Sequence, residues 1–303
     1  MLKTKVLITG SSGLIGSALT SYLIANGIEV LELDIADKEN PRDVLDRDTV
    51  DGLISQCTGV VHLAAISRVV WGEENPELCR HVNLGGTRNI LDAAKSQTNK
   101  PWVLFGSSRE VYGQAPRMPV SEDDELNVIN VYGQTKAEGE KMTLAAREEG
   151  LRTAVVRFSN VYGRCSDHVT RVTPAFARAA VEGTEIRVDG SSHTFDFVHL
   201  DDVLPALLRL IQLLEDGHTT LPPIHLASGR ATTLGELAEW TVECSGGRCT
   251  IREAPERDYD VGKFIGNPSR ARELLDWEAK IIAKEGFKKL VEDFRIMLKK
   301  EPL

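Results

Sequence analysis

The strongest constraint on the fold is a glycine-rich turn that directly follows a short apolar segment near the start of the sequence. Residues 5–9 have the apolar pattern of a buried strand, and glycines at positions 10, 13 and 16 follow at once. Apolar residues then recur at helical spacing until Asn26-Gly27, a typical helix end, and residues 28–33 return to a strand pattern. The first 33 residues therefore predict a strand, a helix and a second strand, which form one βαβ unit.

The same alternation continues through the first half of the chain. It predicts strands near 59–63, 102–106 and 153–158, with helices near 76–95 and 132–149. We expect an α/β fold with a doubly wound parallel (Rossmann) sheet. After residue 165 the alternation stops, and we expect a smaller, discontinuous C-terminal lobe. The predicted boundaries give residues 1–165, with a returning segment at about 195–228, to the sheet domain, and residues 166–194 and 229–303 to the lobe.

The composition argues against two classes of protein. Against 45 Asp and Glu stand 36 Lys and Arg, a formal net charge of −9, and no long basic cluster offers a surface for nucleic acid or an anionic membrane. Arg209 and Gln212 interrupt the longest apolar stretches, so none approaches the roughly 18 apolar residues of a spanning helix. The apolar run at 6–8 is too short for a signal peptide, and the five cysteines are scattered. We expect a cytoplasmic protein with reduced thiols and no metal site.

The glycine-rich turn has the form of a dinucleotide-binding loop. Gly10 allows a tight turn, Gly13 lets backbone amides approach a pyrophosphate, and Gly16 lets the helix pack closely on the strand. Asp34 ends the second strand 18 residues after Gly16, where a carboxylate can accept both hydroxyl protons of an adenosine ribose and would repel a 2′-phosphate. No cation follows Asp34 before Lys38, so the sequence favours NAD over NADP.

A tyrosine and a lysine stand four residues apart at the start of the helix predicted near 132–149. This spacing puts the Tyr132 phenol and the Lys136 ammonium on one helix face, where both can act on one substrate atom. A nearby ammonium and the positive nicotinamide ring favour the phenolate, so Tyr132 could shuttle a proton. Ser108 ends the strand near 102–106 at the carboxyl edge of the sheet, where doubly wound folds bind ligands, and can hydrogen-bond a reacting oxygen.

With these pieces placed, the sequence resembles the extended short-chain dehydrogenase/reductases that modify nucleotide sugars, the epimerase/dehydratase family typified by UDP-galactose 4-epimerase. The resemblance covers nearly the whole chain. Its motifs are TGSSGLIG (9–16), VVHLAA (60–65), VNLGGTRNIL (82–91), SSREVYG (107–113), YGQTK (132–136), RFSNVYG (157–163), FDFVHLDDV (195–203) and LLDW (274–277).

The resemblance implies a role for each matching residue. Ser108, Tyr132 and Lys136 would form the catalytic triad. The NAD site would run along the loop and the strand ends, at Gly10, Ser12, Gly13, Leu14, Ile15, Gly16, Asp34, Asp43, Val44, Leu63, Ala64, Ala65 and Asn83, with Tyr132 and Lys136 also contacting NAD. The nucleotide sugar, expected to be a UDP-sugar, would be held by Ser108, Asn160, Val172, Arg187 and Arg257.

The sequence departs from this family at two positions. Where many relatives have Arg-Asp before an aromatic residue, this chain has Phe195-Asp196, so the diphosphate would depend on Arg257, with Arg171 or Arg187. Glu110 is the second departure, because 4-epimerases usually have a small or neutral residue there. The family's 4,6-dehydratases and UDP-glucuronate decarboxylases also have Glu at this position, but dTDP-glucose dehydratases place Asp before it, where this chain has Arg109.

We therefore expect an NAD-dependent nucleotide-sugar 4-epimerase that acts through a transient 4-keto sugar. The alternatives within the family are a 4,6-dehydratase, a UDP-glucuronate decarboxylase or a 4-keto reductase, with Glu110 as a further catalytic residue. An alternative of another class is a non-catalytic NAD(H)-binding regulator. We also expect a homodimer through the helices near 76–95 and 132–149, on the apolar positions Ile90, Leu91, Ala94, Met142, Ala145 and Ala146.

Overall fold

The computed structural model describes residues 4–300 of the chain. These residues form two compact units. The first unit contains residues up to Gly113, together with Glu122–Phe158 and Leu204–His225. The second contains Gln114–Ser121, Ser159–Val203 and the residues from Leu226 onward. Apart from the short segment Gln114–Ser121, the division therefore follows Phe158, and the segment that returns to the sheet unit, Leu204–His225, is shorter than the predicted 195–228.

The first unit is built on one sheet of six strands. Their order is β2-β1-β3-β4-β5-β10, and the pairs β1–β2, β1–β3, β3–β4 and β4–β5 are parallel. The predicted doubly wound α/β sheet is confirmed, and its strands are β1 (Lys5–Thr9), β2 (Glu29–Leu33), β3 (Gly59–His62), β4 (Trp102–Ser108), β5 (Thr153–Phe158) and β10 (Ile224–Leu226).

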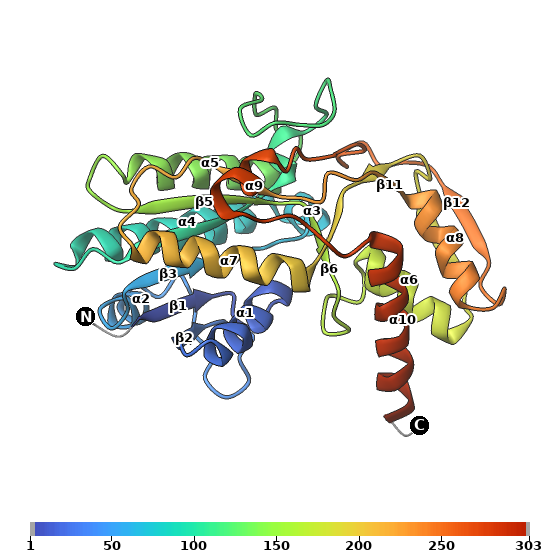
Figure 1. Cartoon of the computed structure of the whole chain (residues 1–303), viewed down its shortest axis with the longest axis horizontal. Coiled ribbons are helices and arrows are strands. Elements are labelled where there is room, and N and C mark those ends of the chain that lie inside the picture. Colours follow the sequence, from blue (N-terminus) through green and yellow to red (C-terminus); the bar gives the residue numbers. More distant parts are fainter. Residues whose placement is uncertain (1–3, 301–303) are drawn as a thin grey trace. The chain divides into compact units, whose positions relative to one another are not determined.

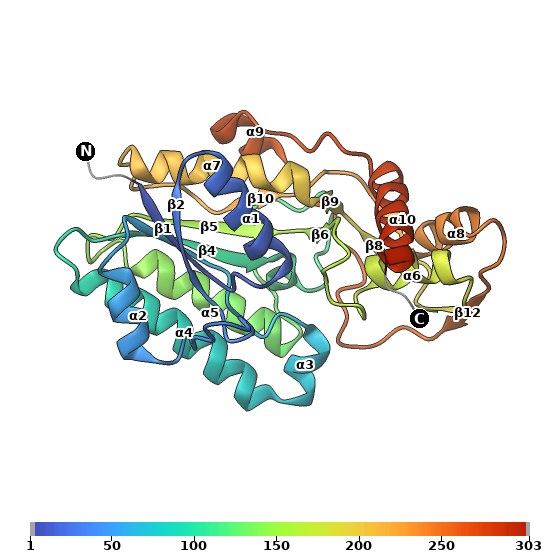
Figure 2. The same ribbon diagram turned by 90° about the horizontal axis from the view of Figure 1, so that it is seen from below.

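Helices cover both faces of this sheet (Figures 1 and 2). Figure 2 shows α1 and α7 on one face and α2, α4 and α5 on the other. The central strands are buried on both sides, which explains their continuous apolar sequence. The helices of this unit, with α7 entering from the second unit, are α1 (Leu14–Ala25), α2 (Arg47–Ile54), α3 (Val69–Glu74), α4 (Pro76–Ser96), α5 (Val131–Ala145), α7 (Leu200–Glu215) and the short 3₁₀ helix η1 (Arg109–Tyr112).

The order of the strands reverses at β1, and this places the ligand-binding edge. The chain passes from β1 to β2 on one side and then crosses back to β3 on the other side of β1. In such sheets ligands bind beyond the carboxyl ends of the strands at this switch point. The loops after β1 and β3 meet there, because the backbone amide of Ala64 donates a hydrogen bond of 3.1 Å to Oγ1 of Thr9. The glycine-rich loop therefore lies at the switch point.

The apolar residues that the sequence offers for a dimer interface pack largely on the sheet. Ile90, Leu91, Ala94 and Ala146 are between 0 and 4% exposed and belong to one core cluster with Leu7, Val60 and other strand residues. Met142 packs against the same cluster, whereas Ala145 is exposed. The assignment of the buried residues to a subunit interface is wrong, because the apolar stripe of each helix covers the sheet.

The second unit has its own core. Buried side chains of α6, α8 and α10 pack with those of short strands, among them Phe176, Leu237, Phe287 and Phe294. Parallel pairs join β7 to β12 and β6 to β9, and an antiparallel pair joins β8 to β11. The elements of this unit are β6 (Asn160–Tyr162), α6 (Val172–Glu182), β7 (Ile186–Asp189), β8 (Thr194–Phe195), β9 (Phe197–His199), β11 (Thr232–Thr233), α8 (Leu234–Cys244), β12 (Ile251–Ala254), α9 (Ser269–Leu275) and α10 (Ala283–Lys300).

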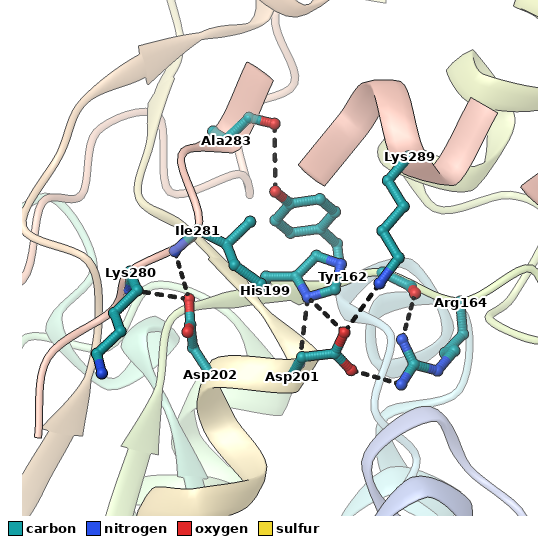
Figure 3. Close-up of polar contacts among 10 residues, drawn as sticks. Tyr162, Arg164, His199, Asp201, Asp202, Lys280, Ile281, Ala283 and Lys289 are labelled. Carbon is teal, nitrogen blue, oxygen red and sulfur yellow. Dashed lines mark hydrogen bonds and ion pairs between the residues drawn. The ribbon is translucent and has the colours of Figure 1, made fainter. Parts of the chain in front are cut away.

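A group of polar contacts joins α10 and the segment before it to β6 and to the end of β9 (Figure 3). The carboxylate of Asp201 pairs with Arg164 at 2.5 Å and with Lys289 of α10 at 3.1 Å. The next residue, Asp202, accepts hydrogen bonds from the backbone amides of Lys280 and Ile281, at 3.1 and 2.9 Å. Burial opposes ionisation of Asp201, but its hydrogen bonds from Arg164 and Lys289 lower its pKa overall. The two adjacent aspartates therefore fix the C-terminal helix to this unit.

Within the described residues, no helix has the combination of length and apolar sequence that membrane crossing requires.

Candidate functional site

The glycine-rich loop has room for backbone only. A Cβ at position 16 would lie 2.1 Å from the carbonyl oxygen of Gly10, and a Cβ at position 10 would lie 2.8 Å from the amide nitrogen of Ala64. Gly10 also has a φ of +72°, which side chains rarely tolerate. Gly13 is the N-cap of α1 and has no side chain to cover the amides of the first turn. The loop therefore presents backbone donors and the positive end of a helix, as a pyrophosphate requires.

Asp34 is held beside this loop. Its Oδ2 accepts a hydrogen bond of 2.9 Å from the amide of Ser12, and its Oδ1 accepts one of 2.8 Å from the amide of Ala36. The carboxylate is partly exposed and stays available to a ligand at the end of β2. The residues present therefore fit a dinucleotide with a free adenosine diol.

The other residues assigned to the NAD site lie along the same edge. Leu63 follows β3, and its amide, like that of Ala64, donates to Thr9. Asn83 of α4 is 4% exposed; its Oδ1 accepts from the amide of Ile66 at 2.8 Å, and its Nδ2 donates to Thr135 of α5 at 2.9 Å. Asn83 therefore ties the loop after Ala65 to the helix that carries Tyr132.

Asp43 and Val44 belong to the segment between β2 and α2. Oδ1 of Asp43 accepts from the amide of Leu45 at 2.9 Å, which folds this segment into a turn. Val44 is 5% exposed and packs on α4, where a Cβ at Gly86 would lie 2.7 Å from its Cγ1. The partly buried Leu14 and Ile15 begin α1 directly after the glycine loop.

Lys136 connects α5, which carries Tyr132, to β4, which carries Ser108. Its ammonium donates a hydrogen bond of 2.7 Å to the carbonyl oxygen of Gly106, two residues before Ser108 at the end of β4. The same ammonium lies 5.8 Å from the ring centre of Tyr132 and 5.0 Å from that of Phe105. Burial lowers the pKa of Lys136 to about 8. A buried cation beside a phenol is the arrangement that favours phenolate.

The start of α5 is fixed to the end of β4, so that Tyr132 is held in place. Asn130 caps the helix by accepting a hydrogen bond of 2.7 Å from the amide of Gly133. A Cβ at position 133 would lie 2.7 Å from the carbonyl oxygen of Glu110, so only glycine allows this approach. Tyr132 and Lys136 are 9 and 5% exposed.

Both carboxylate oxygens of Glu110 are engaged. Oε1 lies 3.0 Å from a guanidinium nitrogen of Arg109, and Oε2 accepts a hydrogen bond of 2.8 Å from the side chain of Asn130. Glu110 is 6% exposed and Arg109 is 8% exposed. The carboxylate therefore supports Asn130, the residue that caps α5.

Apart from Ser108, the residues assigned to the nucleotide sugar belong to the second unit. Oδ1 of Asn160 is buried without a hydrogen-bond partner in the described chain, which makes it a candidate acceptor for a ligand. Val172 begins α6. Each arginine offered for the diphosphate has a carboxylate neighbour: Arg187 pairs with Asp189 at 2.7 Å, Arg257 with Asp260 at 2.8 Å and Arg171 with Asp167 at 3.6 Å.

Asp196, for which no role was predicted, is fully buried in the second unit. Its carboxylate accepts hydrogen bonds from the amide and hydroxyl of Ser228, both at 2.7 Å, and from the amides of Gly229 and Gly266, at 2.9 and 3.1 Å. Burial raises the pKa of Asp196, although these hydrogen bonds oppose that shift. Phe195, which stands where relatives often have Arg, packs against Phe197 at 5.9 Å between ring centres.

A parallel doubly wound sheet, a glycine loop at its switch point and a Ser/Tyr/Lys set at the ends of β4 and α5 define a dinucleotide-dependent short-chain dehydrogenase/reductase fold. Comparison with family models specifies the class further. The model of the NAD dependent epimerase/dehydratase family matches residues 6–221, so the chain belongs to that family and its cofactor is NAD.

Known relatives include enzymes of two kinds. The chain is 29% identical to UDP-glucuronic acid decarboxylase 1 of Arabidopsis thaliana, over 97% of this chain and 70% of that protein. It is also 29% identical to the putative UDP-glucose 4-epimerase of Methanocaldococcus jannaschii, over 94% of this chain and 97% of that one.

Solved structures confirm the fold. The UDP-glucose 4-epimerase of Thermotoga maritima, crystallised with UDP-glucose, superposes with a TM-score of 0.89 at 28% identity, covering 97% of this chain and 100% of that chain. MoeE5 in complex with UDP-glucose and NAD gives a TM-score of 0.90 at 26% identity, covering 97 and 99% of the two chains.

Proposed function

We propose that this protein is an NAD-dependent 4-epimerase of a nucleotide sugar, with a UDP-sugar as substrate. The likeness to proteins that act on or bind UDP-glucose supports the substrate class. The set of Ser108, Tyr132 and Lys136 at one sheet edge supports oxidation and reduction at a sugar hydroxyl.

In this proposal each residue of the triad acts on the C4 hydroxyl of the sugar. Tyr132 takes the hydroxyl proton, Ser108 holds the oxygen by a hydrogen bond, and Lys136 stabilises the phenolate and holds the nicotinamide ribose. Bound NAD supplies a reversible hydride acceptor. The resulting 4-keto sugar rotates within the site, so that its opposite face is reduced. Tyr132 then returns the proton to the C4 oxygen. The net result is inversion at C4 with no net oxidation.

The placement of Glu110 is the observation that favours epimerisation over elimination. Its carboxylate is held by Arg109 and Asn130, so it already serves the start of α5. Elimination of water also needs an acid for the leaving hydroxyl, and Arg109, which stands where dTDP-glucose dehydratases have Asp, stays charged and donates no proton at neutral pH. Epimerisation requires neither a base at C5 nor such an acid.

A second candidate is decarboxylation of a UDP-glucuronate-like sugar, or the related dehydration. Glu110 itself favours it, because the resembling decarboxylases and dehydratases also have Glu there, and the relatives include a UDP-glucuronic acid decarboxylase. A reductase that acts on a ready-made keto sugar needs the same triad. A non-catalytic NAD(H)-binding regulator would not need the triad. The presence of Ser108, Tyr132 and Lys136 therefore supports an enzyme.

Product analysis separates these candidates. The protein with NAD is incubated with UDP-glucose, UDP-galactose, UDP-glucuronate and the GDP-, dTDP- and CDP-sugars, and the products are identified by NMR. Epimerisation predicts an equilibrium mixture of C4 epimers without release of CO₂. Release of CO₂ from UDP-glucuronate, or a 4-keto-6-deoxy product, would replace the epimerase proposal with the second candidate.

We also propose that the protein is a homodimer. The proposal rests on the family resemblance, because the core of the sheet unit uses most of the apolar residues first assigned to the interface. Leu78 of α4, which is 46% exposed, is an apolar side chain still available on that helix. Sedimentation velocity over a range of concentrations tests this, and a monomer at all concentrations would refute it.

A further inference from the structure

A buried ion pair lies directly behind the end of β4. Glu140 of α5 and Arg157 of β5 are 2 and 5% exposed. The guanidinium of Arg157 binds both carboxylate oxygens of Glu140, with Nε to Oε1 at 2.9 Å and Nη2 to Oε2 at 2.7 Å. Ser107 of β4 donates its hydroxyl proton to the same Oε1 at 2.5 Å. Three elements of the sheet unit therefore meet at one carboxylate.

These three elements include the two that carry the proposed triad. Ser107 directly precedes Ser108, and Glu140 stands one helical turn after Lys136 and two turns after Tyr132 on α5. Lys136 makes the second link between the same strand and helix, through the carbonyl oxygen of Gly106. Two adjacent contacts between this strand and α5, one of them made by Glu140, therefore add to the Asn130–Glu110 contact in fixing Ser108 and Tyr132 relative to each other.

Glu140 also places a negative charge near Lys136. His62 of β3 and Cys79 of α4 are titratable groups that also interact electrostatically with Lys136. Burial lowers the pKa of His62 to about 3 and raises that of Cys79, so both are neutral at physiological pH. Burial also lowers the pKa of Lys136, and the charge of Glu140 opposes that shift. Arg157, bound to Glu140, is the counter-charge, and its guanidinium also donates a hydrogen bond to the hydroxyl of Tyr112 in η1.

Stability alone does not account for such a pair. Removing two charges from water costs several kcal/mol, and replacing a buried ion pair with apolar residues is often neutral or stabilising. The Glu140–Arg157 pair carries this desolvation cost, so a role in positioning the site explains its presence better than stability does.

We propose that Glu140 is a positioning residue of this site: through Ser107 and Arg157 it fixes the end of β4 against α5, and it sets the charge balance around Lys136 and Tyr132. The inference rests on the proposed catalytic function for the roles of Ser108, Tyr132 and Lys136. Neither charge of the pair is assigned contact with substrate or NAD.

The first test measures the ionisation of Tyr132 without any sugar. Ultraviolet absorbance of phenolate is followed against pH in each NAD-loaded protein, and the curve of the same protein with Tyr132→Phe added is subtracted, which removes the contribution of Tyr112 and the other tyrosines. Glu140→Gln removes a negative charge, so the Tyr132 phenol should ionise at lower pH, by about half a pH unit or more. Arg157→Gln should move the ionisation in the opposite direction. Glu138→Gln, an exposed position on the same helix, is the matched control and should leave the curve unchanged.

The second test isolates the mechanical link. Ser107→Ala removes the hydroxyl that contacts Glu140 and leaves both charges in place, so turnover should fall about tenfold while the phenol titration stays at its wild-type position. If Glu140→Gln does not fold, the phenol titration of Arg157→Lys, which keeps the charge, is compared with that of Arg157→Gln, which removes it. A folded Glu140→Gln protein with a wild-type titration curve would overturn the proposal. Absence of turnover by the wild type on every nucleotide sugar would contradict the proposed function but would leave the titration result intact.

Discussion

The carboxylate of Glu110 lies 3.0 Å from the guanidinium of Arg109, its neighbour in the sequence, and both side chains are buried. This pair bears on the reaction, because a carboxylate two residues after Ser108 could otherwise remove the C5 proton of a 4-keto sugar. The hydrogen bond from Asn130 gives Glu110 a further partner at the start of α5. In the present geometry Glu110 holds the helix that carries Tyr132.

We therefore predict that Glu110→Gln keeps most of the epimerase activity. Glutamine preserves an acceptor for Asn130 and loses only the ion pair, so turnover should fall no more than about fivefold. NMR of the products over time measures this, with Glu125→Gln, an exposed position of the same unit, as the control. Loss of turnover in Glu110→Gln, together with hydride transfer to NAD in a single turnover, would instead identify Glu110 as a catalytic residue, the base of an elimination or a participant in a decarboxylation.

Tyr132→Phe should lower turnover by a factor on the order of 10² or more, because it removes the positioned acid and base. NAD binding should stay nearly unchanged, since Lys136 and the glycine loop remain. Calorimetric titration of NAD and the product assay together separate the two effects. Tyr22→Phe, on α1, is the control for the loss of a hydroxyl. A Tyr132→Phe protein with near wild-type turnover would remove Tyr132 from its role.

The lowered pKa of Lys136 predicts a pH-dependent stability. Burial lowers this pKa from 10.5 to about 8 in the folded protein, whereas the unfolded chain has the ordinary value. Below pH 8 the folded state therefore holds a charge at a cost, and the cost is relieved as the pH rises from about 8 towards 10.5. Relative to Lys136→Met, the wild type should gain about 2 kcal/mol of unfolding free energy between pH 8 and about pH 9.5.

Urea unfolding of the NAD-free proteins at the two pH values measures this difference. Lys141→Met, an exposed position on the same helix, should show no such change relative to the wild type. A constant difference between wild type and Lys136→Met would mean that Lys136 titrates near its ordinary pKa.

Local patterns were enough to predict much of this fold. Periodicity and glycine placement predicted the main strands and helices because each depends on residues close in the sequence, as at β1, the glycine loop and α1. The short α2 was missed, because it depends on the cap formed by Asp46, which accepts a hydrogen bond from the amide of Thr49. β10 was missed as well, since three residues give no periodicity.

Contacts between distant residues could not be predicted. Glu140 had a local signal, its place one turn after Lys136, but the sequence does not show that Arg157 and Ser107 meet it. The apolar stripe containing Ile90 and Ala94 likewise does not reveal whether it faces a sheet or a second subunit; burial shows that it faces the sheet. The groups that donate hydrogen bonds to Asp196 likewise come from loops far along the chain.

The contacts of Asp34 predict the cofactor selectivity of the protein. Its carboxylate accepts hydrogen bonds from the amides of Ser12 and Ala36 and stays partly exposed at the end of β2. A negative charge there attracts a ribose diol and repels a 2′-phosphate. Asp34→Ala should therefore weaken NAD binding about tenfold or more and leave NADP binding unchanged or tighter, so the difference between the affinities for the two cofactors narrows.

The same substitution also releases the amide of Ser12, so weaker NAD binding alone could reflect a displaced loop. The ratio of the two affinities does not have this ambiguity, since a displaced loop weakens the binding of both cofactors. Asp37→Ala is the matched control, because the Asp37 side chain bonds only to amides of its own turn, those of Glu39 and Asn40, among the described contacts. Calorimetric titration of each cofactor into the three cofactor-free proteins measures the ratio, and equal or tighter binding of NADP by the wild type would refute the role of Asp34.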